Sequence, residues 1–116
     1  MLSKLLGLLR GRPALVQGTA QLPEGHAQTI ALGDPLAGGT EVVLCRVEGV
    51  LYALDRLCPH EGGRLSGGPL VGGRLASCPL HNYRFDPRNG RAVGAACASA
   101  KTYRVRERGP DAEIWT

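Results

Sequence analysis

Alternation of apolar and polar residues is the main pattern along this 116-residue chain. Residues 41–47 alternate clearly, and a second extended run at 50–54 follows the two-residue turn Glu48-Gly49. Two such runs around a short glycine-containing turn predict a β-hairpin. The apolar positions on one face of the first run are Val43, Cys45 and Val47.

Further short strands are expected between turns rich in glycine, proline and aspartate. Helix is expected only at the N-terminus. Eight to ten short strands with such turns indicate an all-β domain, either an antiparallel β-sandwich or a partly open barrel. The remaining strands are expected at residues 14–16, 26–32, 70–71, 74–76, 83–86, 91–93, 102–107 and 112–115.

The first residues of the chain follow a different period. Leucines recur at helical spacing with Lys4 and Arg10 off their face, which predicts a short amphipathic helix at residues 1–12 ahead of a β domain at 13–116. The favoured interpretation is a helix packed on the domain or against a second copy, so an oligomer could form through residues 1–12. A weak interfacial membrane anchor or a partner-binding helix are the alternatives. The leucines of this face are Leu2, Leu5, Leu6 and Leu9.

Length and charge narrow the class of protein. A chain of this size forms a single domain with one modest core. The net charge of +4 comes mostly from arginines scattered along the chain, which argues against nucleic acid binding. No stretch reaches the eighteen apolar residues of a transmembrane span, and the N-terminal segment is too short for a secretory signal, so the cytoplasm is the expected location.

Two short clusters contain the residues that favour metal chemistry. Cys58-Pro59-His60 is followed after seventeen residues by Cys78-Pro79-Leu80-His81. Thiolate and imidazole bind borderline and soft transition metals. Each cluster has one cysteine and one histidine, whereas zinc fingers usually separate a cysteine pair from a histidine pair. A structural zinc site and a set of core or disulfide residues stay open as alternatives.

This arrangement resembles the ligand signature of Rieske [2Fe–2S] proteins. The resemblance runs from about Thr40 to the C-terminus. It implies one [2Fe–2S] cluster per chain at the tip of two loops, with Cys58 and Cys78 on one iron and His60 and His81 on the other. Two neutral imidazoles in place of thiolates make the cluster less negative and raise its potential. Other matching residues are Gly62, Leu65, Gly67, Gly68, Arg84, Phe85 and Asp86.

Departures from high-potential relatives predict a low potential for a Rieske centre. Those relatives have a disulfide beside the cluster, and the corresponding positions here are Gly63 and Leu80. They also donate hydroxyl hydrogen bonds from positions that correspond to Tyr83 and Phe85, and phenylalanine has no donor. We therefore expect the low end of the roughly −150 to +300 mV range. Asn82 replaces a glycine common in ferredoxin-type relatives, but asparagine tolerates left-handed backbone, so the loop should be kept.

The resemblance implies an electron-transfer protein that is not itself an enzyme. Oxygenase subunits add a mononuclear iron with two histidines, and only His26 remains here. The expected role is a one-electron carrier between a flavoprotein reductase and a terminal oxygenase or another acceptor, with a mildly basic surface that suits acidic redox partners. The alternatives are a small subunit of a larger reductase, of the nitrite reductase kind, and a zinc-stabilised interaction module. Docking is expected around Pro59, His60, Leu80 and His81.

Overall fold

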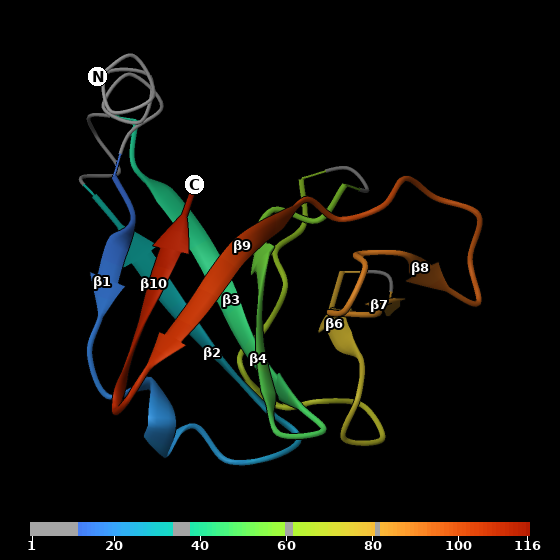
Figure 1. The fold of residues 1–116 in the computed structure, drawn as a ribbon. Helices are drawn as coiled ribbons and strands as arrows, with labels where there is room; N and C mark the ends of the chain where they lie inside the picture. Colours follow the sequence, from blue (N-terminus) through green and yellow to red (C-terminus); the bar gives the residue numbers. More distant parts are fainter. Residues whose placement is uncertain (1–11, 34–37, 60–61, 81) are drawn as a thin grey trace.

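Ten antiparallel strands form two sheets in this computed structural model, which describes residues 12–33, 38–59, 62–80 and 82–116 (Figure 1). The helix predicted at residues 1–12 falls outside this part of the chain, apart from its last residue. The strands are β1 (Ala14–Val16), β2 (His26–Leu32), β3 (Thr40–Val47), β4 (Val50–Asp55), β5 (Gly68–Pro69), β6 (Ala76–Cys78), β7 (Tyr83–Phe85), β8 (Ala92–Val93), β9 (Thr102–Arg108) and β10 (Asp111–Trp115).

The larger sheet has seven strands in the order β1-β10-β9-β4-β3-β2-β5, and the smaller has the order β6-β7-β8. Strands far apart in the larger sheet contribute to one apolar cluster: Val16 of β1 and Ile30 of β2 both pack against it. Because four strands separate these two in the sheet, the sheet must curl around that cluster. The result is the partly open antiparallel barrel expected from the sequence, with the small sheet standing beside it (Figure 1).

Strand β3 is buried on both faces. Val43, Cys45 and Val47 belong to a core that the curled sheet shares with the small sheet, as the alternation predicted. The opposite face of β3 lies inside the curl, where Val42 and Leu44 are fully buried. A strand that lies between two cores has no face exposed to water. Polar residues are therefore rare on both faces, which explains the nearly continuous apolar sequence of β3.

Two details of the predicted strands are wrong. The segments at 70–71 and 74–76 do not form two strands: Val71 and Leu75 make only an isolated bridge around a turn, and β6 begins at Ala76. The turn residues Gly72 and Gly73 both have positive φ, so the chain reverses too tightly for flanking strands to extend. Residues 19–21 form a short 3-10 helix, η1 (Thr19–Gln21), which alternation along the chain cannot reveal.

The β3–β4 turn is held from outside the hairpin. Glu48 and Gly49 have φ values of 52° and 77°, as a two-residue hairpin turn with both central residues left-handed requires. The Glu24 carboxylate accepts the backbone N–H groups of both residues, each at 2.7 Å. This anchor offsets part of the cost of placing a glutamate at positive φ.

Cys45 belongs to the same buried core as Cys58 and Cys78, and Cys97 packs against that core. Cys45 is fully buried, and this burial raises the pKa of its thiol from 9.0 to about 12. Cys97 is half-buried and donates to the carbonyl of Ala98. No disulfide joins any of the four cysteines, all of which the structure describes. Cys45 therefore serves as a small apolar core residue.

Candidate metal centre

The first ligand loop is closed by a short antiparallel ladder that continues from the end of β4. Leu65 donates its N–H to the carbonyl of Arg56 at 2.7 Å, and Cys58 donates its N–H to the carbonyl of Gly63 at 2.8 Å. The intervening pair, Leu57 and Arg64, forms an isolated bridge. Cys58 thus stands at the base of a four-residue loop, 59–62, which contains His60.

The second ligand loop is the β6–β7 hairpin. Cys78, the last residue of β6, pairs with Tyr83, the first residue of β7, and residues 79–82 connect them. Asn82 has a φ of 55°, so the left-handed backbone expected at this position is present. In both loops the cysteine pairs with the residue five positions later and the histidine lies between them. The described ends of the two loops are therefore closed in the same way.

Gly63 is the point where the two loops meet. A Cβ atom built on Gly63 would overlap the Sγ atom of Cys78, and it would lie 3.4 Å from Cβ of Leu80 and 3.5 Å from Cβ of Cys58. The residue at position 63 therefore sits between both cysteines, which come from segments twenty residues apart in the sequence. This close approach fits two thiolates that share one iron, and it requires glycine.

The cysteines are buried beneath an exposed apolar rim. Cys58 is 5% exposed and Cys78 is 0% exposed. Leu57 and Leu80, beside them in the chain, are 58% and 53% exposed, and Pro59 is exposed as well. His60 and His81 lie outside the described residues, and within the described part no three potential ligand side chains gather at one point. Both described ligands are thus shielded from water while the loops around them present apolar surface.

The positions that set the potential in high-potential relatives are visible here. Gly63 and Leu80 face each other across the loops, and neither can form a disulfide. Phe85 is fully buried in the core, so this position provides no hydroxyl group. Tyr83 packs half-buried against the same core.

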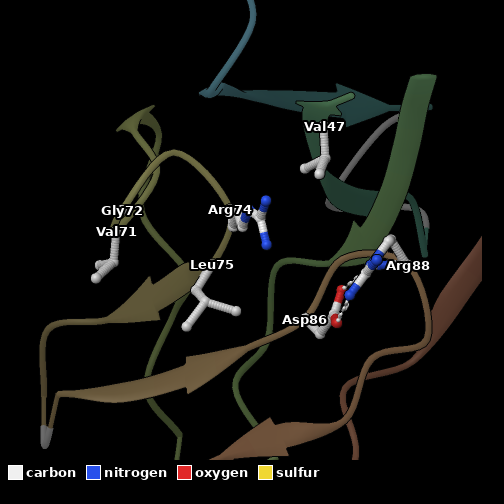
Figure 2. A pocket seen from close by; sticks show the side chains of 7 residues that line it. All are labelled: Val47, Val71, Gly72, Arg74, Leu75, Asp86 and Arg88. Carbon is white, nitrogen blue, oxygen red and sulfur yellow. Dashed lines mark hydrogen bonds and ion pairs between the residues drawn. The ribbon is translucent and has the colours of Figure 1, made fainter. Parts of the chain in front are cut away.

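A pocket of about 340 Å³ lies at the other end of the β6–β7 ladder (Figure 2). Its walls come from the end of β3, the turn before β6 and the turn after β7. Arg88 makes a double ion pair with Asp86, which holds the pKa of that carboxyl below its usual range. The described residues that line this pocket include no cysteine or histidine. Its lining residues are Val47, Val71, Gly72, Arg74, Leu75, Asp86 and Arg88.

Comparison with known proteins decides the class of the centre. Residues 13–104 match the family model of the Rieske [2Fe-2S] domain. The chain belongs to the Rieske [2Fe-2S] domain family. The match begins earlier than the resemblance at Thr40 and includes β1 and β2, which are strands of the same sheet.

Several relatives of this Rieske protein are ferredoxin components of dioxygenase systems. It is 42% identical over 88 residues to the ferredoxin component of the naphthalene 1,2-dioxygenase system of Pseudomonas putida, covering 68% of this chain and 84% of that protein. The ferredoxin of carbazole 1,9a-dioxygenase from Nocardioides aromaticivorans IC177 superposes with a TM-score of 0.70 at 29% identity, over 88% and 95% of the two chains.

A structure of the complex of reduced oxygenase and oxidized ferredoxin in carbazole 1,9a-dioxygenase contains a chain with the same fold. Its TM-score is 0.74 at 20% identity, over 89% of this chain and 92% of that one. The protein is a Rieske-type ferredoxin that carries a [2Fe–2S] cluster and transfers electrons without catalysing a reaction of its own. Among the residues that the structure describes, no helix is long and apolar enough to cross a bilayer.

Proposed function

We propose that Cys58, His60, Cys78 and His81 are the four cluster ligands, in a Rieske domain that comprises residues 13–116. The carrying observation is the meeting of two matched loops at Gly63, which brings both cysteines to one point. Strand β10 pairs with both β1 and β9, which supports extending the domain beyond residue 104. The bound cluster supplies a one-electron couple; the chain positions it and shields it from water.

We propose further that this ferredoxin works in the cytoplasm between a flavoprotein reductase and the terminal oxygenase of a dioxygenase system. The apolar rim at the loop tips, Leu57, Pro59 and Leu80, supports this role because it can form the centre of a small transient interface. Arg64 and Lys101 are exposed beside the first loop and suit an acidic partner. The 42% identity to a ferredoxin component favours a mobile carrier over a permanently bound reductase subunit.

Replacing either proposed histidine ligand should abolish the cluster. We expect His60→Ala and His81→Ala to lack the visible absorption and the EPR signal of a Rieske centre, because each substitution leaves the second iron with a single protein ligand. The measurement is absorption and EPR spectroscopy with iron and sulfide counts after anaerobic purification. His26→Ala is the matched control: His26 begins β2, outside both loops, and its variant should keep the full signal. An intact spectrum in either ligand variant would refute the assignment.

The midpoint potential should lie toward the low end of the roughly −150 to +300 mV Rieske range. The reason is the shortage of hydrogen-bond donors to the cluster sulfurs: Phe85 is buried and lacks a hydroxyl group, so the reduced and more negative state is less stabilised. Redox titration followed by EPR measures this value. A midpoint above about +100 mV would contradict the argument.

A further inference from the structure

Asp55, the last residue of β4, makes the contacts that fix the start of the first ligand loop. Its Oδ1 atom accepts the backbone N–H of Leu57 at 2.8 Å, directly before Cys58. Its Oδ2 atom accepts the hydroxyl of Tyr103 on β9 at 2.7 Å. Its own backbone N–H donates to the carbonyl of Lys101 at 2.8 Å. One side chain therefore ties the ligand loop to the neighbouring strand.

The contacts of Asp55 leave its negative charge without a close cationic partner. No ion pair in the described part of the chain includes this carboxylate; the cationic neighbour Arg56 pairs with Glu41 at 2.7 Å instead. Both of its hydrogen-bond donors, the Leu57 amide and the Tyr103 hydroxyl, are neutral. Burial, and after it the hydrogen bond to Asp55, raises the pKa of Tyr103, which keeps the hydroxyl protonated as a donor to the carboxylate.

Asp55 also lies close along the chain to the proposed ligand Cys58. Three Cα–Cα steps lead from Asp55 to Cys58, and a fully extended chain covers at most about 11 Å in that length. A unit charge at this distance changes an equilibrium involving another unit charge by about tenfold at an effective dielectric constant of about 20. Reduction adds one negative charge to the cluster, so a fixed carboxylate here disfavours it.

We propose that Asp55 is a positioning residue that clamps the first ligand loop to β9 through Tyr103, and that its charge lowers the reduction potential of the cluster. This rests on the proposed ligand set. The clamp and the charge are separable, because an asparagine keeps the acceptor for Leu57 and can donate to the Tyr103 oxygen. Tyr103→Phe does the reverse: it removes the hydroxyl and keeps the charge.

The test compares Asp55→Asn, Tyr103→Phe and a matched control, each loaded with cluster. The control is Asp111→Asn, since Asp111 also accepts a backbone N–H, from Gly18 at 2.9 Å, but lies at the β9–β10 turn. Arg108, the partner of Asp111, lies five residue steps along β9 from Tyr103, or about 17 Å. At a solution potential equal to the wild-type midpoint, the ratio of reduced to oxidised protein is measured by EPR.

We expect the ratio to rise about tenfold in Asp55→Asn, from the charge estimate above, and to stay unchanged in Asp111→Asn. In Tyr103→Phe the ratio should stay equal or fall, because the carboxylate loses a donor, while the EPR line shape broadens as the loop loses its tie to β9. An unchanged ratio in Asp55→Asn, or an equal rise in all three variants, overturns the proposal. Failure of the ligand set would appear differently, as an intact signal in His60→Ala.

Discussion

Gly63→Ala is expected to remove most of the iron and sulfide from the purified protein. A methyl group at position 63 would occupy the space of the Cys78 Sγ atom and also press on Cys58 and Leu80. Moving Cys78 is costly because it is fully buried and belongs to β6, whose backbone is paired with β7. Overpacking of this kind costs about 1–3 kcal/mol of folding stability. The larger effect falls on the cluster, because the two thiolates can no longer approach the same iron.

Gly62→Ala is the control for this experiment. Gly62 has a φ of 71°, and a Cβ atom built there meets nothing among the described residues within 4 Å. The substitution therefore adds only backbone strain, about 1 kcal/mol. We expect this variant to keep its cluster and lose a few degrees of thermal stability. Iron and sulfide analysis with visible absorption distinguishes the two, and a fully loaded Gly63→Ala protein would show that the loops do not meet as described.

The difference between these neighbouring glycines marks the limit of sequence reasoning at the site. The Cys-x-His and Cys-x-x-His spacings predicted the ligand set, and the glycine-rich segment between them indicated loops. Nothing in the composition separates Gly62 from Gly63, because the reason for glycine at 63 is a cysteine fifteen residues later in the chain. Asp55 was missed for the same reason: its acceptor role depends on Tyr103, forty-eight residues away.

The fold was easier to predict where the pattern is local. The β3–β4 hairpin, the β9–β10 hairpin and the strand at β2 follow from alternation and turn residues, and all three are confirmed within a residue or two. The failures lie where tertiary structure overrides that pattern. The turn at Gly72 and Gly73 is too tight for flanking strands. Both faces of β3 are buried because the sheet curls. The pattern of apolar and polar residues along one strand cannot predict that curl.

Arg46 is a charged residue on the face of β3 that lies inside the curled sheet. It lies on β3 in the same direction as Leu44, and its side chain is only 10% exposed. The guanidinium donates to the Glu107 carboxylate at 2.6 Å and to the carbonyl oxygens of Thr19 at 2.9 Å, Leu22 at 3.3 Å and Gly49 at 3.3 Å. One cation thus joins η1, the turn after it, the β3–β4 turn and β9.

Arg46→Met should therefore destabilise the fold by about 3–5 kcal/mol, because several acceptors lose a charged hydrogen-bond donor at once and each such loss costs about 1–3 kcal/mol. Methionine fills much of the volume but donates no hydrogen bond, so three backbone carbonyls and a carboxylate lose their donor. Against a total stability of about 5–15 kcal/mol for a domain, this is a large fraction. Urea unfolding of the cluster-loaded protein, followed by circular dichroism, measures the free energy of unfolding.

Arg108→Met provides the matched comparison on β9. Its guanidinium lies 3.6 Å from Glu113 and its side chain is 61% exposed, so water can replace the ion pair and the loss should stay below about 1 kcal/mol. Equal losses in the two variants would mean that the carbonyl contacts of Arg46 contribute nothing beyond a surface pair. A large loss only in Arg46→Met would establish that a charged residue closes the inner core, where the strand pattern alone favours an apolar one.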